Sequence, residues 1–94
     1  MGAGNPELEA KCLSPNKGQL PIDLANKGKF KFDGWVSLIK NGKELSKEKI
    51  IILRESQKTV HAPYQTEFGK DNLELHFTDL KTGQLLGKSS CKIP

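Results

Sequence analysis

Aromatic residues and long apolar runs are both scarce in this 94-residue chain. Aromatic side chains make up 6% and apolar side chains 35% of the residues, and the apolar share is below that of an ordinary globular domain. No apolar run approaches the ~18 residues that a membrane-spanning helix needs, and no cationic, apolar-cored leader opens the chain. We therefore expect one small domain without membrane insertion, whose modest core needs economical packing or a covalent aid.

Cysteine is also rare, because the chain contains only Cys12 and Cys91, which lie near its opposite ends. No C-x-x-C or metal-type spacing is present, which disfavours a redox or zinc motif. Each cysteine falls in a strand-like segment, and a bridge between them would close nearly the whole chain and restrict the unfolded ensemble strongly. We predict a Cys12–Cys91 disulfide and hence a periplasmic, secreted or cell-surface location. Two reduced thiols in a cytosolic protein are the alternative.

The residue sets that catalysis or metal binding requires are missing. The only imidazoles belong to His61, in a predicted loop, and His76, facing outward on a predicted strand. There is no G-x-S-x-G elbow, and a Cys–His pair would need a free thiol that a disulfide removes. Neither H-E-x-x-H nor a D-x-D-x-D-G calcium loop occurs. We predict no catalytic residue, no metal site and no cofactor, and do not expect an enzyme.

Charge is positive but dispersed, since the net charge of +4 comes from fourteen lysines and one arginine with acids between them. Interleaved lysine is typical of a solvated surface. The one basic stretch with aromatic residues carries Lys27, Lys29 and Lys31 around Phe30, and we take these lysines as a candidate basic surface. On a five-stranded barrel such aromatics could stack nucleic-acid bases. Alternation instead predicts that Phe30 and Phe32 share one face in the core, which disfavours nucleic-acid binding.

Period-two alternation dominates the chain and predicts strands. It is clear in residues 8–12, 20–24 and 73–77, while residues 35–39 are apolar on both faces, as expected of a central strand. Pro21 indicates an edge position or a bulge, because proline cannot donate to a ladder. Asn41-Gly42 predicts a type I′ hairpin.

Two stretches are harder to interpret. Residues 43–49 are polar and fit a loop, a short strand or one helical turn before the β-branched strand 50–53, and residues 68–72 resemble a turn. Strands that recur every 8–12 residues, without a convincing helix, favour an antiparallel sandwich over a small barrel. We predict that residues 8–94 form one all-β, immunoglobulin-like sandwich of about seven strands, and that residues 1–7 are disordered or derived from expression cloning.

The placement of Cys12 in the first strand, Trp35 in a central strand and Cys91 in the last resembles an immunoglobulin-like sandwich. Antibody domains place their bridge between the second and sixth strands, so the resemblance extends to the architecture and transfers no ligand-binding residue. A narrower resemblance is to the small periplasmic immunoglobulin-like proteins that restrain curli amyloid subunits. It is carried by the cysteine in opening strand 8–13, the Lys40-Asn41-Gly42-Lys43 hairpin, the Glu55-Ser56-Gln57-Lys58 turn and the closing Gly87-Lys88-Ser89-Ser90-Cys91.

That resemblance implies non-catalytic holding of an unfolded fibre subunit in the periplasm. We accordingly predict a non-catalytic extracytoplasmic module that binds another protein, either as a chaperone or inhibitor of fibre or amyloid subunits or as an accessory domain of a cell-surface protein. The alternatives are a structural spacer within a larger surface protein and a basic barrel that binds single-stranded nucleic acid. A monomer is expected, because Pro21 and the dense lysines discourage uncontrolled pairing of sheet edges.

Overall fold

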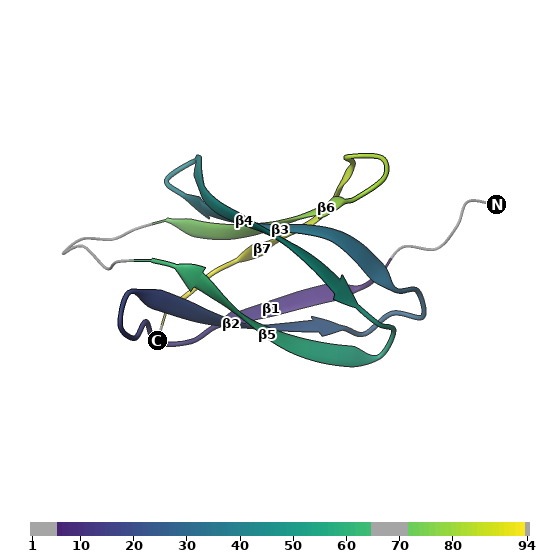
Figure 1. Ribbon diagram of the computed structural model, residues 1–94, viewed down its shortest axis with the longest axis horizontal. Coiled ribbons are helices and arrows are strands. Elements are labelled where there is room, and N and C mark those ends of the chain that lie inside the picture. The colour runs from purple at the N-terminus through teal and green to yellow at the C-terminus, as the bar shows by residue number, and fades with distance from the viewer. Residues whose placement is uncertain (1–5, 65–71, 94) are drawn as a thin grey trace.

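The computed structural model describes residues 6–64 and 72–93, which form seven antiparallel strands in two sheets (Figure 1). The predicted turn at residues 68–72 lies outside the described residues except for Asn72. The strands are β1 (Leu8–Cys12), β2 (Gln19–Asn26), β3 (Phe32–Lys40), β4 (Lys43–Ile52), β5 (Ser56–Pro63), β6 (Leu73–Asp79) and β7 (Leu85–Ser90).

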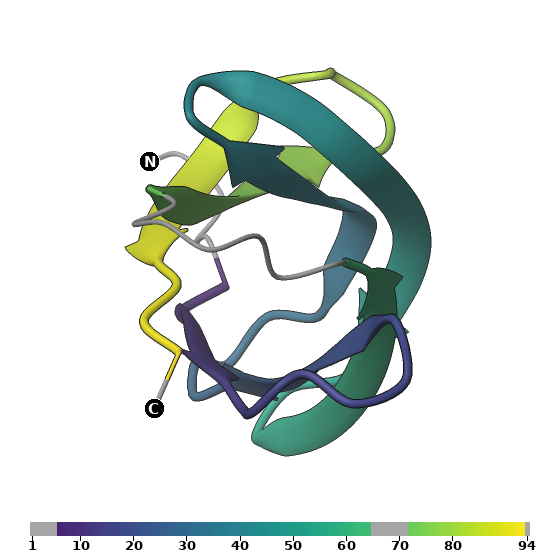
Figure 2. The same ribbon diagram turned by 90° about the vertical axis from the view of Figure 1, so that its left-hand side faces the viewer.

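The two sheets face each other as a sandwich and do not close into a barrel. One sheet has the order β1-β2-β5 and the other the order β4-β3-β6-β7, and Figure 2 shows the two layers end on. The all-β, seven-stranded antiparallel sandwich predicted from the sequence is therefore confirmed. The fourth strand remains beside the third, whereas antibody constant domains place it in the opposite sheet.

The core comes from the alternating apolar positions. Leu20, Ile22 and Leu24 are fully buried from β2, and Leu75 and Phe77 meet them from β6. The Phe77 ring packs edge-on against that of Phe32, with 5.9 Å between centroids and 89° between planes, the geometry that aromatic quadrupoles prefer. The period-two pattern thus identifies the buried face of each of these strands correctly.

The β3–β4 hairpin has the predicted turn. Asn41 and Gly42 have φ angles of +50° and +85°, and Lys40 pairs with Lys43 across the two-residue loop, as a type I′ turn requires. The polar residues 43–49, left open by the sequence, continue β4 as one strand with a register shift opposite Leu38 and Ile39. They can do so because an edge strand needs backbone pairing on only one side.

Pro21 corrects one prediction, because it lies in the central strand of its sheet and no bulge interrupts β2 there. The Leu13 amide donates to the Pro21 carbonyl at 2.9 Å. The nitrogen and carbonyl of one strand residue face the same neighbour, so the missing N–H of Pro21 faces the chain just after β1 has ended at Cys12. A central strand tolerates proline here because the neighbouring ladder stops.

Phe30 and His61 give two further corrections. Residues 27–31 form a loop instead of extending β3, so Phe30 is 49% exposed while Phe32 is fully buried. The prediction of a shared core face for the two rings was wrong, because alternation does not continue through the loop. His61 lies within β5, not in a loop, and its side chain is exposed.

A disulfide joins the first strand to the residue after the last one. Cys12 and Cys91 are both buried and have Cα atoms 5.4 Å apart, which confirms the predicted pairing. A bridge of this kind is typical of an oxidising compartment outside the cytoplasm. Among residues 6–64 and 72–93, no helix is long and apolar enough to cross a membrane.

Candidate functional site

The two lateral sides of the sandwich differ. On one side the edge strands β1 and β7 lie near each other, and the Cys12–Cys91 bridge ties their sheets together. On the other side the edge strands β4 and β5 lie near each other without a disulfide and are joined by the turn at residues 53–55 (Figure 2). An edge strand presents backbone N–H and C=O groups that have no ladder partner. The β4/β5 side is therefore where the backbone of another chain could pair.

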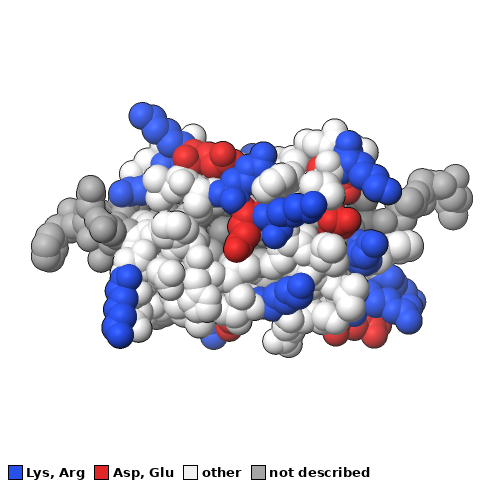
Figure 3. All heavy atoms as spheres, viewed as in Figure 1, with Lys and Arg blue, Asp and Glu red and all other residues white. Residues whose placement is uncertain are grey.

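A groove lies between these two edges, with a volume of about 310 Å³. Its rim is formed by residues 46–48 of β4 and residues 61–63 of β5, and its floor by core residues that include Ile22, Val36, Leu38 and Val60. This side faces the viewer in Figure 3, where an uncharged area lies among the scattered charges. The groove combines an apolar floor with a polar rim, which is the usual composition of a binding cleft.

The sequence of β4 explains why the sandwich stays open here. The residues of β4 on the core side are Ile50 and Ile52 in its second half, and both are buried. In the first half the same side carries Ser46 and Glu48, which pair with core residues of β3, and on β5 the exposed Lys58 pairs with buried Leu24. Polar residues at these positions cannot seal the core. Charges that point inward from an edge also discourage indiscriminate strand pairing.

Lysine side chains cover the outer surface beside this edge. The Lys47 ammonium lies 4.5 Å from the centre of the Trp35 ring, and Lys49 pairs with Trp35 in the β3–β4 register. A cation over an indole face contributes about 0.5–1 kcal/mol at an exposed site. The half-buried indole is thus covered by lysine and is not a free stacking platform.

The predicted basic surface is not part of the groove. Lys27, Lys29 and Lys31 are all exposed in the β2–β3 loop, at the end of the sandwich away from the β3–β4 hairpin (Figure 1). The Lys27 ammonium lies 3.0 Å from a carboxylate oxygen of Glu9. The three lysines belong to one loop, where alternation had predicted a strand, and they are separated in the structure from the candidate binding edge.

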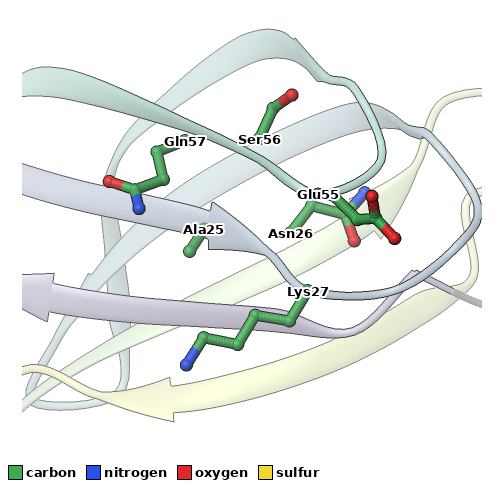
Figure 4. A pocket seen from close by; sticks show the side chains of 6 residues that line it. All are labelled: Ala25, Asn26, Lys27, Glu55, Ser56 and Gln57. Atoms are coloured by element: carbon green, nitrogen blue, oxygen red, sulfur yellow. The ribbon is translucent and has the colours of Figure 1, made fainter.

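A second hollow of about 290 Å³ lies beside this loop, lined by Ala25, Asn26, Lys27, Glu55, Ser56 and Gln57 (Figure 4). The buried Asn26 donates through Nδ2 to the carbonyls of Phe30 at 2.7 Å and Ile52 at 3.2 Å. Its Oδ1 accepts from the Gly28 amide at 3.0 Å. These bonds tie the β2–β3 and β4–β5 turns together, so Asn26 holds the fold and has no free polar atom aimed at a ligand.

One arrangement of potential catalytic groups was not anticipated from the sequence. The β3–β6 register places Ser37 beside His76, and His76 Nε2 lies 3.9 Å from a Glu74 carboxylate oxygen. The Ser37 side chain is buried, and His76 Nε2 makes no hydrogen bond to any described residue. Nucleophilic catalysis needs a hydrogen bond from nucleophile to base. In this geometry the trio provides no activated serine.

Metal-binding groups are likewise not brought together in the described part of the chain. No three His, Cys, Asp or Glu side chains of residues 6–64 and 72–93 cluster as metal ligands would. Asp79 caps a turn instead: its carboxylate accepts hydrogen bonds from the Thr82 and Lys81 amides at 2.9 and 3.0 Å, whereas Asp23 within β2 accepts from the Thr59 hydroxyl of β5 at 2.8 Å. The amide bonds to Asp79, with that of the Thr82 hydroxyl, hold the pKa of Asp79 below its ordinary value.

No family model, curated protein or solved structure matches this chain. What is shown is a β-sandwich of three and four strands, with a disulfide on one side and a groove between β4 and β5 on the other. We therefore argue function from the geometry of the open edge.

Proposed function

We propose that this domain is a non-catalytic module that binds another protein by taking an extended segment along its open β4/β5 edge. The observation that carries this proposal is the groove of about 310 Å³ between two unpaired edges, on the side opposite the disulfide. In strand addition, main-chain hydrogen bonds supply affinity, and pockets for alternate side chains supply selectivity. The apolar floor of the groove offers such a pocket.

The lengths of the two edges also favour an extended partner. β4 contributes ten residues and β5 eight, so a segment of several residues can pair along either one. The disulfide keeps β1 and β7 together on the far side, so a partner can enter at β4/β5 without separating the sheets there. Glu48 and Lys58 are on the core side of their strands. They would limit binding to segments that leave the charges of these two residues in water.

For the partner we propose an unfolded fibre or amyloid subunit, in the periplasm or at the cell surface. The disulfide supports the compartment, and the sequence resemblance to periplasmic proteins that restrain curli subunits supports the choice of subunit. An accessory binding domain of a cell-surface protein would use the same edge. The oligonucleotide-binding barrel considered from the sequence has a different fold from the sandwich observed.

Delay of fibre formation tests the proposal. The oxidised protein at sub-stoichiometric ratio should lengthen the lag of thioflavin fluorescence when an amyloid-forming curli-type subunit assembles. Ser46→Trp would place an indole at the mouth of the groove and should abolish the delay. Ser90→Trp is the matched control, because Ser90 is exposed on β7, the edge strand beside the disulfide. Thermal unfolding of both variants checks that the fold is intact.

Two results would count against the proposal. An equal delay by wild type and Ser46→Trp would mean that the groove is not the binding site. No delay even at equimolar ratio would reject the fibre subunit as partner and favour the spacer.

A further inference from the structure

Apolar side chains are exposed at the end of the sandwich that carries the β2–β3 and β4–β5 turns. Phe30 is 49%, Ile51 41% and Leu53 58% exposed. Ile51 and Leu53 are two residues apart at the end of β4, on the side opposite the buried Ile52. Large apolar side chains exposed near turns have no packing role in a monomer. Contact with another molecule or with a membrane would explain their exposure.

The Asn26 amide brings together the backbone segments that carry these side chains. Its Nδ2 donates to the carbonyls of both Phe30 and Ile52, so the loop that carries Phe30 lies against the turn that begins with Leu53. Figure 1 shows both turns at the same end of the sandwich. We call residues 27–31 and 51–55 the cationic tip.

The cationic tip holds most of the excess charge of the molecule. It contains four cations, Lys27, Lys29, Lys31 and Arg54, against one carboxylate, Glu55, which leaves +3 of the total of +4. Figure 3 shows several Lys and Arg side chains at this end, with some Asp and Glu side chains among them. Glu9 of β1 pairs with Lys27, but Lys29, Lys31 and Arg54 form no ion pair with any carboxylate in the described part of the chain.

We propose that the cationic tip is a docking site for an anionic lipid surface. Phe30, Ile51 and Leu53 enter the boundary between headgroups and acyl chains, while the surrounding cations contact the lipid phosphates. Apolar side chains ringed by Lys and Arg are what peripheral binding to anionic membranes requires. The contact is peripheral, and no segment crosses the bilayer.

A lipid surface fits the tip better than the nucleic acid considered from the sequence. Base stacking uses aromatic faces along a groove that follows the strand, whereas only one of the three exposed apolar residues here is aromatic. Two aliphatic side chains beside a turn give no stacking surface but suit a hydrocarbon boundary. The tip is also distinct from the groove rim, because Ile51 follows Glu48 of the rim by three residues along β4, about 10 Å, and its side chain lies on the opposite side of the strand.

Vesicle co-sedimentation of the full chain tests this site. Wild type should bind vesicles of equimolar phosphatidylcholine and phosphatidylglycerol and should leave pure phosphatidylcholine vesicles unbound. Lys29→Glu/Lys31→Glu/Arg54→Glu should bind on the order of 100-fold more weakly, since each cation near an anionic leaflet contributes about fivefold in affinity. The control Lys11→Glu/Lys88→Glu/Lys92→Glu has the same net charge on exposed positions elsewhere and should retain most of the binding.

A second variant tests the apolar contact separately from the charge. Phe30→Ser/Leu53→Ser keeps every cation and should leave binding that disappears at moderate salt, because only screened attraction remains. Circular dichroism and thermal unfolding of each variant identify any that fail to fold, and Phe30→Ser alone then replaces the double variant.

The proposal is overturned if wild type does not bind anionic vesicles, or if the tip and control triple variants lose binding to the same extent. Binding of single-stranded oligonucleotide that depends on the tip, with no vesicle binding, would also overturn it in favour of a nucleic-acid surface. Preservation of the fibre-delay activity in the tip triple variant would show that the two sites are separate.

Discussion

Replacing Cys12 and Cys91 by alanine removes the disulfide that links the two sheets. The bridge joins residues 79 positions apart, so nearly the whole chain is closed into a loop. Closing about 80 residues lowers the entropy of the unfolded chain by about 15 cal/mol/K, which corresponds to about 4.5 kcal/mol at 25 °C. A domain of this size is stable by only about 5–15 kcal/mol, so the bridge accounts for a large part of its stability.

Packing adds a smaller loss. Both cysteines are buried, and removing the two sulfur atoms leaves small voids that cost about 1 kcal/mol each. The double alanine variant should therefore lose about 6.5 kcal/mol. Chemical reduction of the wild type breaks the loop but keeps both sulfur atoms, so it isolates the contribution of chain closure.

Urea unfolding of three samples separates the two contributions: oxidised wild type, reduced wild type and Cys12→Ala/Cys91→Ala. Reduction should lower the free energy of unfolding by about 4.5 kcal/mol and raise the m-value, because the unlinked unfolded chain exposes more surface. If reduction changes the free energy of unfolding by less than about 1 kcal/mol, the chain-closure reasoning is refuted.

Three further changes follow from individual contacts. Asn26→Ala removes two hydrogen bonds within the β2–β3 loop and one to the Ile52 carbonyl at the end of β4, and should cost about 2–4 kcal/mol in urea unfolding. Gly34→Ala places a Cβ against the Thr78 carbonyl oxygen, and because backbone must move it should cost more than about 3 kcal/mol or prevent folding. Asp79 should titrate below its ordinary pKa of 3.8 in carboxyl NMR, because the Thr82 amide and hydroxyl stabilise its anion. Its contribution to stability is present above that ordinary pKa and is lost as pH falls through the lower folded value.

Opposite results would be informative. A neutral Asn26→Ala would mean that the two turns are held by other contacts, and a stable Gly34→Ala would mean that β3 and β6 are less closely spaced at that point. An Asp79 carboxyl that titrates at or above its ordinary pKa would show that the turn bonds do not persist in solution.

The local sequence pattern predicted most of the strands, because the residues of each buried face alternate within one short segment. The Asn41-Gly42 turn and the Cys12–Cys91 bridge were also predicted correctly, the first from backbone preference and the second from the number and position of the cysteines. Phe30 was misassigned because alternation does not reveal where a loop ends and a strand begins. Pro21 was misassigned because the end of the neighbouring strand, β1, decides whether its missing N–H matters.

The candidate site could not be predicted in the same way. The groove depends on β4 and β5 lying on the same side of two different sheets, which only the strand order determines. Ser46, Glu48 and Lys58 carry a signal in the sequence, since they place polar residues at core-side positions. That signal can be interpreted only once the register of β4 with β3 and of β5 with β2 is known.

Amide chemical-shift mapping tests the central claim most directly. The isotope-labelled, oxidised protein is titrated with an unfolded curli-type fibre subunit. Backbone amide chemical shifts are followed in strands β1 to β7. Binding along the β4/β5 edge predicts that the largest changes lie at residues 46–48 of β4 and 60–62 of β5, with β1 and β7 nearly unchanged. Changes confined to β1 and β7, or no changes at saturating subunit, would contradict it.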